Sequence, residues 1–161
     1  MKVICFEKVE EENGYLSVWY PCSFFIDGYK FWCVEQYLQY RKALMFNDNY
    51  RADKLLNAVD RKEIMQYSKG VVNYVDKVWN ARRHINLYKA NYAKFSQNND
   101  LKNLLLATED IVLVKCGKTD KVWGSGLNYG DTRLYNLSRW DGLNLHGFTL
   151  MEVRDTLKKE V

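Results

Sequence analysis

This chain of 161 residues is poor in the residue patterns that build metal sites and disulfide frameworks. It has two histidines and four cysteines, and no two cysteines form a Cys-x-x-Cys pair. Structural zinc sites need closely spaced cysteines and histidines, so we expect neither a metal nor another cofactor. Scattered cysteines are typical of free thiols in a reducing compartment, which predicts a cytoplasmic protein.

Long apolar runs and prolines are equally scarce. No apolar run approaches the roughly 20 residues that cross a membrane, and Glu7 comes too early for a signal peptide's apolar segment. With one proline, 15% aromatic residues and no repeat or low-complexity stretch, the chain reads as globular throughout. At this length we expect a single compact domain over residues 1–161.

Strong charge of one sign is also missing. The net charge of +4 is small and is spread along the chain. Such mild basicity is compatible with a phosphate-bearing ligand, whereas a dedicated nucleic-acid binder usually carries a stronger basic block. A structural protein that binds nucleic acid non-specifically is therefore not favoured.

Apolar periodicity and turn residues predict a mainly helical α+β fold with a small β element. Asp27-Gly28 favours a tight hairpin between 23–26 and 29–31, and 111–114 is expected to be a buried strand. Residues 116–143 are rich in Gly, Asp and Asn, which predicts a long functional loop. Helices are expected at Val34–Phe46, Arg51–Asn57, Arg61–Lys69 with Asp60 as its cap, Val75–Ser96, Leu101–Ala107 and Leu145–Lys159.

One carboxylate, Glu35, lies inside a strongly aromatic and apolar helical segment, Phe31–Ala43. At 100° per residue, Glu35, Gln39 and Lys42 form a polar stripe roughly 60° wide. So narrow a stripe rarely faces open water, and we expect Glu35 to lie in a pocket. The plainer interpretation is a first-turn Glu that complements the helix dipole and pairs with Gln39.

Together with five later motifs, this segment resembles the NADAR, or YbiA-like, family. The resemblance covers residues 14–157 approximately, and it implies a YbiA-like helical domain that acts as an N-glycosidase on ribosides. The five motifs are Trp79-Asn80-Ala81-Arg82, Ala93-Lys94-Phe95-Ser96-Gln97-Asn98, Leu104-Leu105-Leu106-Ala107-Thr108, Asp120-Lys121-Val122-Trp123-Gly124-Ser125-Gly126 and the stretch from Asn144 to Arg154.

The resemblance implies catalytic roles for Glu35, Lys94 and Asp120. Breaking a ribose–base bond passes through an oxocarbenium-like transition state, so the site needs a carboxylate near the anomeric carbon. Partial burial of Lys94 would lower its pKa and make it a nucleophile, or the ammonium could simply pair with an anion. From the residues alone, Asp120 could also only cap its own loop and Lys94 could be a surface lysine.

The expected substrate-binding residues are aromatic, basic or small. Tryptophans offer flat faces to a base, although they are as often core residues, and arginine can hold a phosphate bidentately. Glycines allow a ligand to approach the backbone, or serve only a tight turn. The set is Trp19, Trp79, Arg82, Trp123, Gly124, Gly126 and Asn144.

Departures from the family pattern concern the substrate more than the reaction. Val18 stands where the family commonly has an amide, Lys115 stands where a glutamate is usual, and Lys69-Gly70 replaces the usual Gly-Arg. The resemblance implies cleavage of ADP-ribose from guanine in nucleic acid, or of a ribosylaminopyrimidine phosphate intermediate of riboflavin synthesis. The alternative is a module that binds ADP-ribose or a nucleotide without turning it over.

Overall fold

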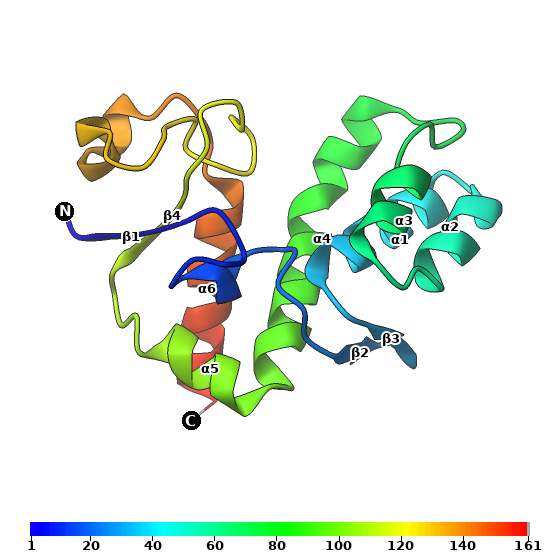
Figure 1. The fold of residues 1–161 in the computed structure, drawn as a ribbon, viewed down its shortest axis with the longest axis horizontal. Helices are drawn as coiled ribbons and strands as arrows, with labels where there is room; N and C mark the ends of the chain where they lie inside the picture. The colour runs from blue at the N-terminus through cyan, green and yellow to red at the C-terminus, as the bar shows by residue number, and fades with distance from the viewer. Residues whose placement is uncertain (161) are drawn as a thin grey trace. The chain divides into compact units, whose positions relative to one another are not determined.

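The computed structural model describes residues 1–160 and divides into two compact units (Figure 1). The central unit is Pro21–Asn98, and the terminal unit combines Met1–Tyr20 with the described part of Asn99–Val161. Helices dominate and strands are few and short, which confirms the mainly helical α+β class. A single domain over the whole chain stays a prediction.

The central unit consists of a short hairpin and four helices. Helix α1 packs against both α2 and α4, and β2 packs against α4. Asp27 and Gly28 have φ values of 52° and 81°, so both hairpin turn residues are left-handed as predicted. The elements are β2 (Phe24–Ile26), β3 (Tyr29–Phe31), α1 (Val34–Met45), α2 (Asn49–Leu56), α3 (Arg61–Tyr67) and α4 (Asp76–Ser96).

Buried side-chain hydrogen bonds fix the ends of these helices. The Gln36 amide donates to the carbonyls of Leu55 and Ala58 at 3.0 and 3.2 Å, and its oxygen accepts from the Trp32 amide at 2.9 Å. The end of α2 is thereby held to the start of α1. Asp60 accepts from the Glu63 amide at 2.8 Å, which confirms the predicted cap of α3.

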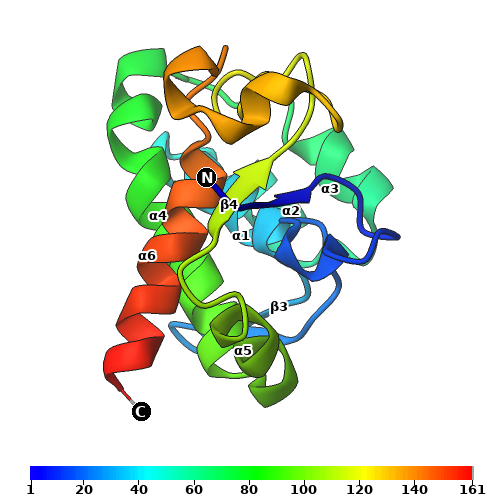
Figure 2. The same cartoon turned by 90° about the vertical axis from the view of Figure 1, so that its left-hand side faces the viewer.

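The terminal unit pairs two helices with a two-stranded parallel sheet. Strand β1 lies beside β4 with Ile4 opposite Leu113, and Figure 2 shows β4 along α6. The sequence did not predict β1, because four residues without a turn beside them give too weak a signal. The elements are β1 (Val3–Phe6), α5 (Asn99–Leu106), β4 (Val112–Lys115), α6 (Leu145–Lys159) and the 3₁₀ turns η1 (Gly14–Leu16), η2 (Thr132–Tyr135) and η3 (Leu137–Arg139).

Asn144 joins α6 to β4. Its side-chain nitrogen donates to the Leu113 carbonyl at 2.9 Å, and its side-chain oxygen accepts from the Lys115 amide at 2.9 Å. Asn144 is fully buried and takes a left-handed conformation with φ 49°, which asparagine tolerates better than most residues. A Cβ at Gly147 would lie 2.2 Å from the Leu113 carbonyl oxygen, so the helix can approach the strand only with glycine there.

We predict that Asn144→Ala lowers the free energy of unfolding by about 2–4 kcal/mol, because two buried backbone groups of β4 lose their partners. Asn144→Gly loses the same hydrogen bonds but accepts the positive φ, so it should be less destabilised than the alanine variant by roughly 1 kcal/mol. Urea unfolding measures both, with exposed Asn103→Ala as the control. Parent-like stability of Asn144→Ala would contradict this role.

Candidate functional site

Glu35 lies in the first turn of α1 and is partly buried. Its Oε1 accepts a hydrogen bond of 2.7 Å from the Gln39 side chain, one turn further along the helix. This contact is the one that the plainer interpretation expects, and it also fixes the direction of the carboxylate. A catalytic role for Glu35 therefore stays a prediction, now with a defined orientation.

Lys94 is completely buried near the end of α4. Burial lowers the pKa of its ammonium from 10.5 to about 8, although the nearby thiols of Cys22 and Cys33 act in the opposite direction. Its Nζ lies 5.0 Å from the centre of the Phe95 ring. Lys94 is thus a core lysine rather than a surface one, and a useful fraction of its amine is neutral near pH 8.

Cys33, at the N-terminal end of α1, is the residue that both Glu35 and Lys94 influence electrostatically. Cys33 caps this helix, its Sγ accepting from the Gln36 amide at 3.4 Å. Burial raises the pKa of Cys33 to about 12, and the negative charge of Glu35 acts in the same direction. Lys94 interacts electrostatically with the same thiol, so Cys33 is influenced both by the Glu35 carboxylate and by the buried amine.

Hydrogen bonds from Gln97 and Asn98 hold the C-terminal end of α4, which carries Lys94. The Asn98 side chain donates to the Lys94 carbonyl at 2.8 Å and to the Ser23 carbonyl at 3.0 Å. Gln97 exchanges two hydrogen bonds of 2.8 Å with the Phe25 backbone. These contacts hold the last turn of α4 against the hairpin and so fix the Lys94 position.

Trp79 and Arg82 lie near the other end of α4. The helix is unbroken over 21 residues, so Trp79 and Lys94 are separated by about 22 Å along it. Trp79 is 7% exposed and belongs to the core, whereas Arg82 is exposed. The structure does not bring these two residues to Lys94, and their contact with substrate stays a prediction.

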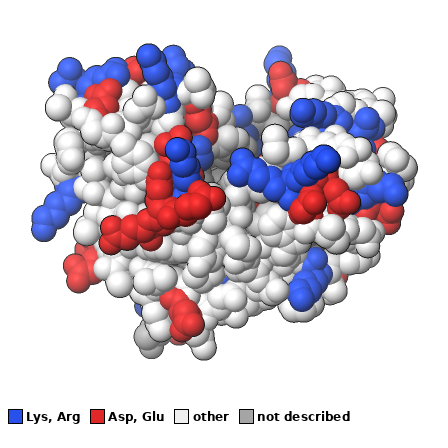
Figure 3. All heavy atoms as spheres, viewed as in Figure 1, with Lys and Arg blue, Asp and Glu red and all other residues white. Residues whose placement is uncertain are grey.

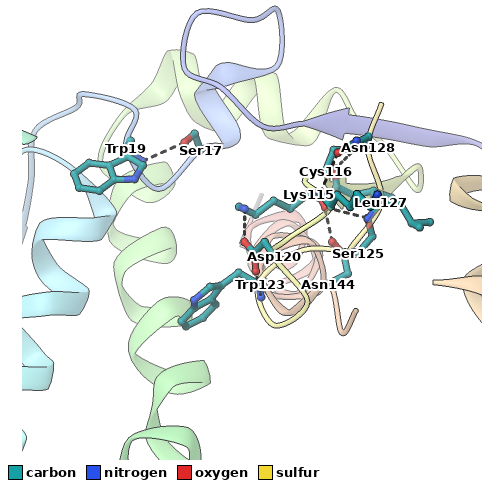
Figure 4. Close-up of polar contacts among 12 residues, drawn as sticks. Ser17, Trp19, Lys115, Cys116, Asp120, Trp123, Ser125, Leu127, Asn128 and Asn144 are labelled. Carbon is teal, nitrogen blue, oxygen red and sulfur yellow. Dashed lines mark hydrogen bonds and ion pairs between the residues drawn. The ribbon is translucent and has the colours of Figure 1, made fainter. Parts of the chain in front are cut away.

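Asp120 is the centre of a polar cluster in the terminal unit (Figure 4). It forms an ion pair with Lys115, and its Oδ1 accepts from the Trp123 amide at 2.9 Å. Burial alone would raise the pKa of Asp120, but Lys115 and the backbone amides of Trp123 and Gly124 outweigh it and hold that pKa below its usual range. Asp120 is therefore ionised at neutral pH, and it also caps its own loop.

The two glycines of this loop are needed for the packing of the loop itself. A Cβ at Gly124 would lie 2.9 Å from the Lys115 carbonyl oxygen and 3.0 Å from that of Asp120. Gly126 has a φ of 71°, and a Cβ there would lie 3.0 Å from Asp141 Cβ. This geometry favours the tight-turn interpretation, and approach of a ligand to either glycine stays a prediction.

Trp19 and Trp123 are partly exposed in the terminal unit. The Trp19 amide donates to Ser17 Oγ at 3.2 Å, and Figure 4 shows both indoles extending away from β4. Asn144, in contrast, uses both ends of its amide on β4, so the structure gives it an anchoring role. Sequence reasoning noted Lys115 only as a departure from the family pattern and gave it no role in the site.

Within residues 1–160 no group of three or more His, Cys, Asp and Glu side chains is arranged to hold a metal ion. None of the helices formed by the same residues combines the length and apolar character that a membrane crossing requires.

Comparison with known proteins identifies the family. The NADAR domain model matches residues 5–158. An N-glycosidase of Acanthamoeba polyphaga mimivirus is 31% identical over 144 residues, which cover 86% of this chain and 85% of that protein. A riboflavin biosynthesis protein of Vibrio vulnificus is 31% identical over 156 residues, 97% of this chain but 39% of that protein.

The fold agrees with this assignment. The NMR structure of the Escherichia coli protein YbiA matches with a TM-score of 0.81 and 26% identity, covering 99% of this chain and 86% of that one. The chain belongs to the NADAR domain family. The expected NADAR, YbiA-like N-glycosidase family is thereby confirmed.

We predict that the stability of the parent protein relative to Lys94→Met rises as the pH increases from 8 to 10.5. The Lys94 pKa is lower in the folded protein than in the unfolded chain, so the unfolded chain binds the proton more tightly within this window. The difference in the free energy of unfolding between the parent and Lys94→Met should change by on the order of 3 kcal/mol, at about 1.4 kcal/mol per pKa unit. Urea unfolding across this range measures it, with exposed Lys89→Met as control; a gap independent of pH would refute the burial argument.

Proposed function

We propose that this chain hydrolyses the C–N bond between a ribose and a base, with Glu35 and Lys94 as its central catalytic pair. The observation that carries the proposal is the buried Lys94 amine, whose pKa of about 8 leaves part of it neutral, together with the oriented Glu35 carboxylate, since both groups act electrostatically on the Cys33 thiol. The names of the family relatives support the type of reaction.

The carboxylates supply negative charge to a transition state that is positive. As the base departs, charge develops on the anomeric carbon and the ring oxygen of ribose, and a fixed carboxylate lowers the energy of that state. Glu35 is the proposed carboxylate of the central unit. Asp120, ionised beside Lys115, is the proposed second carboxylate.

Lys94 supplies the nucleophile in the proposed mechanism. Its neutral amine attacks the anomeric carbon, the C–N bond to the base breaks with the electrons going to the base, and the base takes up the proton that the attacking nitrogen loses. The resulting ribosylamine opens to a protonated Schiff base as its ring oxygen takes a proton from water, which is returned when the Schiff base is hydrolysed. Water then adds to the Schiff base carbon, and cleavage of the lysine–carbon bond releases the sugar and restores the free amine.

The charge distribution supports an anionic substrate. The central unit carries 13 Lys and Arg against 7 Asp and Glu, a net charge of +6, while the whole chain has +4. Figure 3 shows basic side chains interspersed with acidic ones over the face drawn, without one continuous basic surface. This pattern suits a phosphate-bearing ribosylated base, either ADP-ribosylated guanine in nucleic acid or a ribosylaminopyrimidine phosphate.

The test is a substrate panel followed by chromatography and mass spectrometry. The parent protein is incubated with guanine-ADP-ribosylated DNA, free ADP-ribose, NAD and a ribosylaminopyrimidine phosphate, and release of base or sugar is recorded. We expect turnover of one ribosylated base and none without protein. Tight binding of ADP-ribose with no release from any substrate would instead identify a binding module.

Glu35→Gln should lower kcat by roughly a hundredfold or more and leave KM nearly unchanged. The amide keeps the shape of the side chain but removes the charge that stabilises the oxocarbenium ion, and the loss of such a group falls on turnover. Steady-state kinetics on the active substrate measure this, with exposed Glu10→Gln as the matched control. Full activity of Glu35→Gln would exclude Glu35 from catalysis.

A further inference from the structure

Lys115 uses all of its polar groups to hold the loop that contains Asp120 (Figure 4). Its amide donates to Asn144 Oδ1 at 2.9 Å, and its carbonyl accepts from the amide and the hydroxyl of Ser125 at 2.9 and 3.2 Å. Its ammonium pairs with Asp120 Oδ2. One residue at the end of β4 therefore contacts the start of α6, Ser125 within the loop and the Asp120 carboxylate.

We infer that Lys115 is a positioning residue for the proposed reaction, because its ammonium pairs with the Asp120 carboxylate and holds it in one direction. The inference rests on the proposed function. According to this inference, Asp120 stays negatively charged and stabilises a cationic transition state. Asp120 is then not the acid that protonates the leaving base.

The Asp120 carboxylate keeps capacity for a substrate despite these contacts. Oδ2 faces Lys115, Oδ1 accepts from the Trp123 amide, and the Gly124 amide also interacts with the carboxylate, whose two oxygens together offer about four acceptor positions. The Asp120 side chain is 25% exposed and that of Lys115 is 19% exposed. The pair is therefore accessible from outside the unit yet dry enough for its charges to interact strongly.

Two further charged residues, Glu7 and Lys121, belong to the surroundings of Asp120. Glu7 follows β1, which ends with Phe6 opposite Lys115. Glu7 Oε1 and Asp120 Cβ lie 3.5 and 3.9 Å from the point that a Cβ on Gly117 would occupy, so a second carboxylate is close by. Lys121 in the same loop is exposed and its charge is screened by solvent.

The sign of the effect follows from these neighbours. Burial disfavours the ionised form of Asp120, whereas Lys115 and the amides of Trp123 and Gly124 favour it. With Lys115 present, the pKa of Asp120 lies below its usual range despite burial. Without the ammonium, burial and the two amides remain, and the pKa of Asp120 must rise. As the solution is acidified, a variant without the Lys115 ammonium would then lose the activity that needs ionised Asp120 at a higher pH than the parent does.

The test uses two measurements on the full chain. The first is the pKa of the Asp120 carboxyl group, obtained by ¹³C NMR of protein labelled at aspartate, with Asp120→Asn identifying the signal. The second is the pH profile of kcat/KM on the active substrate. In Lys115→Met we expect the Asp120 pKa and the acid limb of the profile to move up together by about one to two pH units. Lys115→Arg should restore both, and Lys121→Met should change neither. The backbone contacts of Lys115 are kept in every variant, and unchanged β4 amide signals verify the fold.

The outcomes separate this inference from the proposed function. An active Lys115→Met with an unmoved Asp120 pKa and acid limb overturns the positioning role while the proposed function stands. A uniform loss of kcat at every pH, not restored by arginine, also overturns it and leaves Lys115 a structural residue. If the parent cleaves no substrate, the proposed function falls and takes the positioning role with it, even if the Asp120 pKa moves.

Discussion

Burial of the Lys94 ammonium is the constraint on which the proposed site depends. A charged amine inside a protein core is unfavourable, so the group either finds compensation or yields its proton. Here burial prevails over the opposing influence of Cys22 and Cys33, and the pKa falls to about 8. Several features of the central unit serve this placement: α4 runs without a break to Ser96, and Gln97 and Asn98 hold its end to the hairpin.

The terminal unit solves the opposite problem, which is to keep a carboxylate charged while it is half-buried. Asp120 remains ionised because Lys115 and two backbone amides outweigh the cost of burial. Close packing at Gly124 and the anchoring of α6 by Asn144 hold Lys115 and the loop in place. A fixed anion stabilises the positive charge that develops in a cationic transition state.

Local signals predicted most of the fold, and non-local contacts account for what was missed. The Asp27-Gly28 turn and the Asp60 cap depend on adjacent residues, and both were predicted correctly. Strand β1 forms only by pairing with β4, more than a hundred residues away, and α5 starts at Asn99, two residues earlier than predicted. Motif resemblance named Lys94 and Asp120, but whether Lys94 was exposed or buried depends on tertiary packing. The role of Lys115 required its contacts to be seen.

The most direct test of the account is reductive trapping at Lys94. The parent protein is mixed with the substrate it cleaves in the presence of borohydride, and the product is digested and mapped by mass spectrometry. The account predicts a reduced sugar adduct on the Lys94 peptide, formed with loss of the base, and no adduct in Lys94→Ala. Base release by the parent without any adduct, together with partial activity in Lys94→Arg, would contradict a covalent lysine.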